Sequence, residues 1–263
     1  VGNRDLGGQT YFIRPAQLDV IRFTSQSANA LIDTSVVGSL RLENGYTGTV
    51  TLANGLTVQG DVILQSGTLA AGAHTLALGG DWTAQGGAFQ AGTSTVELID
   101  RRQHSTISGN TTFYNFVSTT AGKHLYFAQA STQVTQGLFD VHGTDGTNKE
   151  DLIRLHSTDQ GGVQWQWNPQ GGASIDYVIL GDAKNLSTTI YKVKPSFSHG
   201  NNTGWDTDPT WDFGAGDAFW SSANNWLPNG APGASDDLTF DNTSDANSTA
   251  DIAGPFASLT LAA

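Results

Sequence analysis

The sequence predicts an all-β protein built as a right-handed parallel β-helix, a β-solenoid of stacked coils with about 20 residues per coil. Segments 67–78 and 87–98 match at a constant offset of 20 in residue number, and five of their twelve positions are identical. Apolar and polar residues alternate in short runs between glycine-containing turns, a pattern typical of strands with one buried face. Because such short strands cannot bury a face alone, strands that return once per repeat must stack on one another.

Composition supports this fold class and excludes several functions. Only 14% of the chain is charged, while 12 Phe and 7 Trp are enough to fill an elongated core. No apolar run approaches the ~18 residues of a membrane helix, so we expect no membrane insertion. The net charge of −12 argues against a nucleic-acid partner. The absence of cysteine excludes disulfides and thiolate metal sites.

Taken in order, the chain divides into four regions. We predict an N-terminal lead-in over 1–14, a β-helix repeat unit over 15–195, a loop or linker region over 196–235, and the start of a next unit or donated strands over 236–263. The coils should form one continuous parallel β-helix from about Thr49 to Leu180. The period-2 pattern predicts these inward-facing side chains: Leu69, Leu76, Leu78, Phe89, Val96 and Leu98.

A second, longer repeat links the two ends of the chain. Segment 15–42 recurs in 232–261 with an offset in residue number that drifts from 217 to 219, as small loop insertions would produce. The matched residues are Pro15 and Pro232, Asp19 and Asp236, Phe23 and Phe240, Asn29 and Asn247, Asp33 and Asp251, and the tetrapeptides 39–42 and 258–261. The chain therefore holds one full unit and then begins another.

This C-terminal repeat predicts an assembly surface. Isolated first strands of a unit should leave their apolar side chains poorly covered and their edges unpaired. Either the unit continues into neighbouring repeats of the same polypeptide, or its C-terminal strands dock onto another copy. Both arrangements are head-to-tail and do not close, so they give a filament with an axial repeat of roughly 50 Å from about eleven coils. The expected assembly residues are Leu238, Phe240, Phe256, Leu259 and Leu261, with Trp220 and Trp226 capping the junction between units.

Residues 220–240 contain three motifs in succession, Trp-Ser-Ser-Ala-Asn-Asn-Trp at 220–226, Gly-Ala-Pro-Gly at 230–233 and Asp-Asp-Leu-Thr-Phe at 236–240. These motifs resemble the autotransporter-associated or adhesin-like β-strand repeats of giant bacterial surface proteins. The stretches 45–50, 92–96, 107–115 and 175–178 are also similar to segments of such arrays. The resemblance implies a right-handed parallel β-helix, tandem copies and an extracellular or cell-surface location. Residues 1–14 depart from the pattern because they lack the Trp-x5-Trp stretch.

Candidate catalytic residues are sparse. Asp236-Asp237 is the only Asp dipeptide, but neighbours on a strand point to opposite faces, so a turn before a strand is favoured over an acid pair for glycoside hydrolysis. A polysaccharide lyase would need a basic residue beside clustered acids, and Arg101-Arg102 and Lys149-Glu150-Asp151 offer no such cluster. We therefore predict that the protein is not an enzyme, and we assign no catalytic residue.

Metal and sugar binding are the remaining alternatives. No cofactor is expected, although calcium stays open as a minor hypothesis because it takes six to eight oxygen ligands. The carboxylates dense enough to supply them are Asp206, Asp208 and Asp212, and Asp241, Asp245 and Asp251. The six histidines lack a metal-binding spacing, so structural roles are favoured. Trp165 and Trp167 share one face of a strand, where they form either core or an outward platform for sugar rings.

The sequence thus favours a non-catalytic structural repeat of an extracellular filament or giant bacterial surface adhesin. Its partners would be copies of itself or neighbouring repeats, and surface polysaccharide is a further candidate. The alternative functions are a carbohydrate-binding β-helix module and, less favoured, a polysaccharide lyase or hydrolase.

Overall fold

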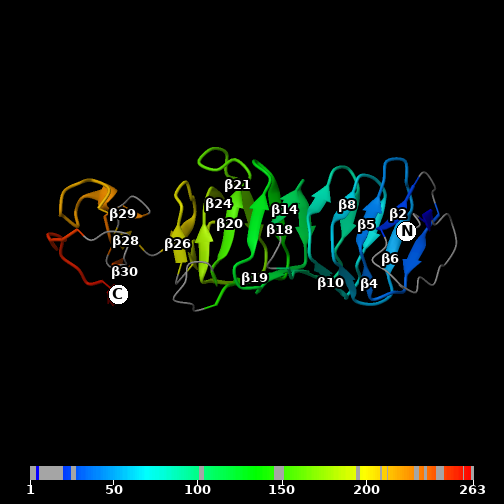
Figure 1. Ribbon diagram of the computed structural model, residues 1–263, viewed down its shortest axis with the longest axis horizontal. Coiled ribbons are helices and arrows are strands. Elements are labelled where there is room, and N and C mark those ends of the chain that lie inside the picture. The colour runs from blue at the N-terminus through cyan, green and yellow to red at the C-terminus, as the bar shows by residue number, and fades with distance from the viewer. Residues whose placement is uncertain are drawn as a thin grey trace.

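The computed structural model describes residues 4–5, 20–24, 28–100, 104–144, 151–193, 196–207, 209–211, 213–227, 231–233, 236–240, 246–256 and 258–261. Parallel strands stack in a β-solenoid of about 10 turns, with successive turns about 21 residues apart. Figure 1 shows the elongated stack and, beyond its β26 end, a smaller C-terminal unit. The predicted fold class is confirmed. The described part of the chain contains no helix with the length and hydrophobicity that crossing a membrane would require.

Each regular coil contributes one strand to each of three faces. The first face is a ten-stranded parallel sheet with strands β1 (Arg4–Asp5), β2 (Val20–Phe23), β5 (Ser39–Leu42), β8 (Val62–Leu64), β11 (Trp82–Ala84), β14 (His104–Ser108), β17 (His124–Phe127), β20 (Ile153–Ser157), β23 (Val178–Leu180) and β26 (Ser196–Ser198). The second face is a seven-stranded sheet with strands β4 (Val36–Val37), β7 (Leu56–Val58), β10 (Thr75–Leu78), β13 (Thr95–Leu98), β16 (Asn115–Ser118), β19 (Leu138–His142) and β22 (Gly172–Asp176).

The third face consists of two four-stranded sheets that follow one another along the stack. One contains β3 (Ala30–Ile32), β6 (Thr49–Leu52), β9 (Thr68–Ala70) and β12 (Ala88–Gln90). The other contains β15 (Thr111–Phe113), β18 (Thr132–Thr135), β21 (Trp165–Pro169) and β24 (Ala183–Asn185). A last parallel pair, β25 (Tyr191–Val193) and β27 (Trp205–Thr207), follows in the chain.

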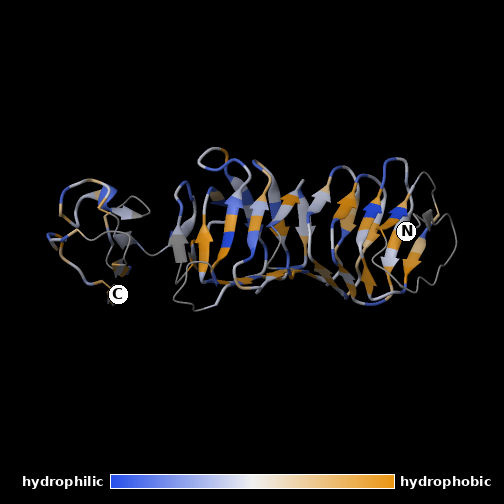
Figure 2. Ribbon diagram, in the orientation of Figure 1, coloured by the Kyte–Doolittle hydropathy of each residue, from blue (hydrophilic) through white to orange (hydrophobic). Residues whose placement is uncertain are grey.

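The short sequence repeat corresponds to the strand register. Val62 pairs with Trp82, Leu69 with Phe89, and Leu76 with Val96, so the offset of 20 joins residues that are neighbours in adjacent coils. Five of the six predicted inward side chains are at most 1% exposed, and Phe89 is partly buried against Trp82. Figure 2 shows that the strands mix hydrophobic and hydrophilic residues throughout the stack, as expected for strands with one buried face.

The turns explain why glycines recur at the same offset. Gly72 and Gly92 occupy equivalent corners of successive coils, with φ of 62° and 59°, a region that L side chains rarely adopt. A Cβ on Gly92 would also collide with the carbonyl oxygen of Gly72 in the coil before it. Close stacking of the coils at this corner therefore requires glycine.

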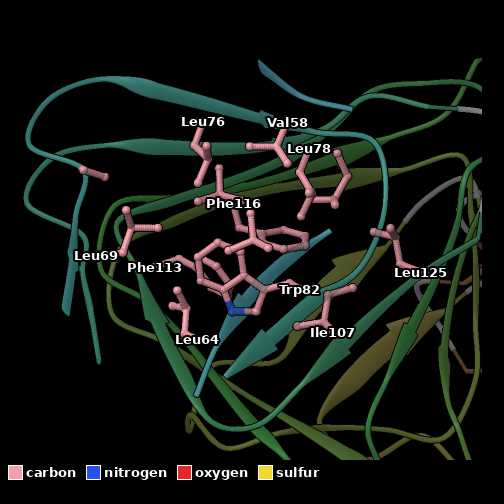
Figure 3. Packing of buried hydrophobic residues seen from close by; sticks show 14 of the residues in the cluster. Val58, Leu64, Leu69, Leu76, Leu78, Trp82, Ile107, Phe113, Phe116 and Leu125 are labelled. Atoms are coloured by element: carbon pink, nitrogen blue, oxygen red, sulfur yellow. The ribbon is translucent and has the colours of Figure 1, made fainter. Parts of the chain in front are cut away.

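Aromatic rings become more frequent in the core from Trp82 onward. Figure 3 shows Trp82, Phe113 and Phe116 packed together among Leu64, Leu69 and Ile107. Phe116 stacks on Phe139 with centroids 5.4 Å apart, and a partly buried Trp205 stacks on Trp167 at 5.1 Å. Burial of each large apolar side chain contributes about 1.5–3 kcal/mol, so this continuous core stabilises the solenoid.

Side chains also bridge consecutive coils at the start of the ten-stranded sheet's strands. The hydroxyl of Ser39 accepts a hydrogen bond from the Asp61 backbone N–H at 3.1 Å. Asp61 Oδ1 accepts from the Asp81 N–H at 3.1 Å, and Asp81 Oδ1 accepts from the Thr106 N–H at 2.7 Å. One acceptor side chain per coil thus binds the next coil, which fixes the register without a core contact.

The solenoid extends further than the sequence analysis assigns. Strand β26 pairs with β23, and β27 pairs with β25, so residues up to 207 continue the parallel stacking. The sequence favours a loop here because the strands are short and the segment is rich in Asn and Gly. The amide of Asn202 shows why such residues occur in a coil, since its Oδ1 accepts from the Ala183 N–H at 3.0 Å and its Nδ2 donates to Leu180 O at 3.0 Å.

Candidate functional site: the C-terminal strand edge

The C-terminal unit is a four-stranded sheet with a core of its own. Its strand order is β29 (Trp226–Leu227), β28 (Thr210–Trp211), β30 (Asp237–Phe240) and β31 (Ser258–Leu261). The short 3₁₀ helix η2 (Ala223–Asn225) precedes β29. Strand β29 is antiparallel to β28 and forms the edge beyond it, so the sheet does not continue the ten-stranded sheet.

Strands β28, β30 and β31 reproduce the first strands of the solenoid. In the solenoid β2 pairs with β5 so that Val20 faces Ser39 and Phe23 faces Leu42. In the C-terminal sheet β30 pairs with β31 so that Asp237 faces Ser258 and Phe240 faces Leu261. The long sequence repeat aligns these same positions, and the strand order β28-β30-β31 corresponds to the order β1-β2-β5. The long repeat is therefore also a repeat of strand pairing and register.

The second core gathers most of the predicted assembly residues. Trp226 is fully buried, contacts Trp220 with ring centroids 5.7 Å apart, and donates from Nε1 to the Trp220 carbonyl oxygen at 2.9 Å. Phe240 packs against Trp220 at 5.3 Å, and Leu238 is completely buried. Phe256 lies 5.8 Å from Trp220, and Trp211, which was not predicted, completes the cluster. The expectation that Leu238 would be poorly covered was wrong because these indole rings enclose it.

The polar residues between the two tryptophans hold the loop in shape. Buried Asn225 donates from Nδ2 to the carbonyl oxygens of Asp217 and Phe219 at 2.7 and 3.0 Å. Ser222 donates to Asp217 Oδ2 at 2.8 Å, and Ser221 N–H donates to Asp251 Oδ1 at 2.8 Å. Hydrogen bonds from the Phe219 N–H, then from Ser222 and Asn225, lower the pKa of Asp217. The Ser221 hydroxyl likewise lowers the pKa of Asp251.

Strand β31 leaves two leucines exposed at the end of this sheet. Leu259 is 54% exposed and Leu261 is 74% exposed, whereas their equivalents in β5, Leu40 and Leu42, are completely buried. Within the described ranges, no strand pairs with the outer edge of β31. In the solenoid the corresponding edge of β5 pairs with β8, which places Val62 beside Leu40. We take β31 and its exposed leucines as the candidate functional site, and call it the β31 edge.

The two tryptophans considered as a sugar platform lie in the core. Trp165 and Trp167 are both 0% exposed. Trp167 Nε1 donates to Thr135 Oγ1 at 3.0 Å, and Trp165 stacks on Phe127 with centroids 4.0 Å apart. The platform hypothesis was therefore wrong, because the shared face of β21 points inward.

The candidate acids have separate structural partners. Asp236 Oδ2 accepts from the Gly233 N–H at 2.7 Å, and Asp237 Oδ1 accepts from the Ser258 hydroxyl at 2.6 Å. Asp208, Asp212, Asp241, Asp245, Arg101, Arg102, Lys149 and Glu150 lie outside the described residues. Among the described residues, no group of three or more His, Asp or Glu side chains is arranged to hold a metal. The calcium hypothesis stays a prediction.

Sequence reasoning missed one cluster. It treated the six histidines as scattered, whereas the structure brings His104, His124, His156 and His199 to one sheet face. The available signal was the spacing of His104 and His124, which equals one coil of the short repeat.

Comparison of the chain with protein-family models, with curated proteins and with solved structures gives no match.

Proposed function

We propose that the protein is a non-catalytic structural repeat that assembles head-to-tail in an extracellular filament or giant surface adhesin. The observation that carries the proposal is the β31 edge. The same Ser-Leu-x-Leu strand is buried at 39–42 and exposed at 258–261, although its register with the preceding strand is identical. An exposed strand edge with apolar side chains recruits a further strand.

The strand that fits this edge is defined by the solenoid itself. Strand β8 covers β5 with Leu40 beside Val62 and Leu42 beside Leu64. The Asp61 N–H, just before β8, binds the Ser39 hydroxyl, and Ser258 is the equivalent of Ser39. A second unit would therefore add its β8 to β31, with Val62 beside Leu259 and Leu64 beside Leu261. The second unit is either the next repeat of the same polypeptide or another copy whose first strands are replaced.

The resemblance to adhesin-like repeats supports the extracellular setting of this proposal. Its Trp-Ser-Ser-Ala-Asn-Asn-Trp motif forms the second core and the loop that orders it. Two cores that share no residue suit a chain of rods joined at regular intervals. This arrangement needs no convergent reactive groups, only repeated stacking.

The proposal is tested by joining a second unit to the chain. Because residue 258 corresponds to residue 39, residue 263 corresponds to residue 44, and the fusion continues at residue 45 of the second copy. Amide hydrogen exchange is measured at 259–261 in the single chain and in the fusion. We expect the β31 amides to become as protected as those of β5, since pairing with β8 removes them from water.

A matched fusion carries Val62→Asp and Leu64→Asp in the second copy only. It has the same length but a β8 strand that cannot cover the leucines, so its β31 amides should exchange as in the single chain. Fast exchange at 259–261 in the unaltered fusion would show that β31 does not accept this strand, and the proposed assembly would be wrong.

A further inference from the structure

Four of the six histidines lie on the outward side of the ten-stranded sheet. His104 on β14 pairs in register with His124 on β17, and their ring centroids are 4.6 Å apart. His156 on β20 contacts His199, just after β26, with centroids 4.9 Å apart. Tyr126 joins the two pairs, because its ring lies 5.6 Å from His104 and 6.4 Å from His156. We call this row of rings the histidine face.

The row of rings continues past β23 because the residue after that strand is a glycine. Gly181 follows β23, and a Cβ there would lie 2.6 Å from Nδ1 and 2.8 Å from Cε1 of His156. The His156 ring therefore lies over the glycine backbone and reaches His199 on the far side. As a result His156 is only 6% exposed although it projects from the outward side of the sheet.

The charged groups around the row are mostly cationic. His124 faces Arg154 across the β17–β20 pairing, and its other titratable neighbours are His104, Lys123 and Tyr126. His156 faces His199, Arg154, Asp182 and His124. Asp182 is the one carboxylate among them, and it already accepts from Asn201 Nδ2 at 2.8 Å and from the Gly161 N–H at 2.9 Å.

Both central imidazoles are consequently neutral near pH 7. Burial, and then the neighbouring Arg154 and His104, lower the pKa of His124 from 6.5 to about 4. Burial, and then His199 and Arg154, lower the pKa of His156 to about 4 as well. An opened coil would release both rings to water, where they take up protons at their ordinary pKa.

We propose that the histidine face is an acid-sensitive switch, in which protonation of His124 and His156 opens the pairing of β20 with its neighbours β17 and β23. Acidification places new positive charges beside Arg154 in a stack whose spacing of about 4.8 Å does not let them separate. Because the closed state binds these protons less well than the open state, closure is fully favoured above about pH 6.5. It weakens as the pH falls from there toward about 4. This behaviour does not depend on the β31 edge.

The test measures opening of β20 in the full chain. Hydrogen exchange of the amides at 153–157, corrected for the intrinsic pH dependence, is followed from pH 7 to 4.5. Each imidazole contributes up to about tenfold per pH unit to the opening constant, and partial solvent exposure reduces this. We expect the opening constant to rise at least about tenfold between pH 6.5 and 4.5 in the native chain. It should stay nearly constant in the double variant His124→Gln/His156→Gln.

Two further measurements keep the result decisive. His74→Gln, in the turn between β9 and β10, should retain the native pH dependence, because that histidine lies outside the histidine face. If the double variant does not fold, imidazole titration in the native chain by NMR replaces it, and His124 and His156 should titrate well below 6.5. Equal pH dependence in the native chain and the double variant, or titration of both rings near 6.5, would overturn the proposal.

Discussion

The strand pairs β2–β5 and β30–β31 have matching sequence patterns and the same register but differ in burial. Leu40 and Leu42 are fully buried, whereas Leu259 and Leu261 are 54% and 74% exposed. The first pair is followed by β8 and the rest of the solenoid, while no described strand follows β31. In a solenoid, a strand's own sequence thus sets its pairing with the previous coil, and its burial is supplied by the next coil.

The chain that precedes each pair differs as well. Strands β1 and β28 hold equivalent places in their sheets. Strand β28 is followed by the loop with Trp220 and Trp226, η2 and β29, whereas the sequence after β1, residues 6–19, contains no tryptophan. This loop contributes Trp220 and Trp226 to a separate core that buries one side of β30. The equivalent strand β2 is instead buried by the core of the solenoid. A two-strand ladder can therefore be stabilised by a local aromatic cluster as well as by stacked coils.

The largest expected effect comes from truncating equivalent leucines. Leu42→Ala should lower the free energy of unfolding by about 2–5 kcal/mol, because it leaves a cavity in a fully packed core. Leu261→Ala should change it by less than about 0.5 kcal/mol, since the side chain is mostly in water. Chemical unfolding followed by circular dichroism measures both. Similar losses for the two variants would mean that β31 is already covered in solution.

A more local effect is expected from the second core. Trp226→Ala should destabilise the C-terminal sheet by about 3–5 kcal/mol, because a fully buried indole and its hydrogen bond to Trp220 are lost. Hydrogen exchange should show β30 losing protection while β10, deep in the solenoid, keeps it. Loss of protection in both strands would show that the two cores fold as one unit.

The smallest effect concerns the paired serines. Ser39→Ala should cost about 1 kcal/mol, because the Asp61 N–H loses its acceptor between two coils. Ser258→Ala should cost less than about 0.5 kcal/mol, because the exposed Ser258 hydroxyl donates its hydrogen bond to the Asp237 carboxylate where water can replace it. In the two-unit fusion the cost of Ser258→Ala should rise to that of Ser39→Ala. An unchanged cost there would contradict the register proposed for β8 on β31.

The sequence predicted the fold well where insertions are absent. The constant offset between segments 67–78 and 87–98 predicted how their strands pair and that Leu69, Leu76 and Val96 are buried. Periodicity is informative there because each coil repeats the previous one. Between β11 and β14 the chain lengthens, and Trp82 pairs with Ile107, so the offset grows from 20 to 25. Past that point the offset varies from coil to coil, from 20 between His104 and His124 to 30 between His124 and Arg154, so no single offset identifies all neighbours.

The candidate site was only partly predictable for the same physical reason. The sequence motifs predicted that Trp220, Trp226 and Phe240 lie at a junction between units. The burial of Leu238 and the exposure of Leu261, in contrast, depend on which strands and side chains lie next to them in the fold. Period-2 spacing predicts that Trp165 and Trp167 share one face of their strand, but it does not predict which face is buried. That depends on how the strand pairs with its neighbours β18 and β24. His156 and His199 meet only because Gly181 lies between them in space, which no spacing in the sequence reveals.

The existence of two cores that share no residue has a mechanical consequence. The short segment between β27 and β28 is the only covalent connection from one core to the other. Pulling force applied to the two ends must pass through that single segment, whereas inside the solenoid it is shared among neighbouring coils. A chain of such units under tension would lengthen in steps, with each aromatic core yielding as a separate event and acting as an extensible joint between stiffer rods.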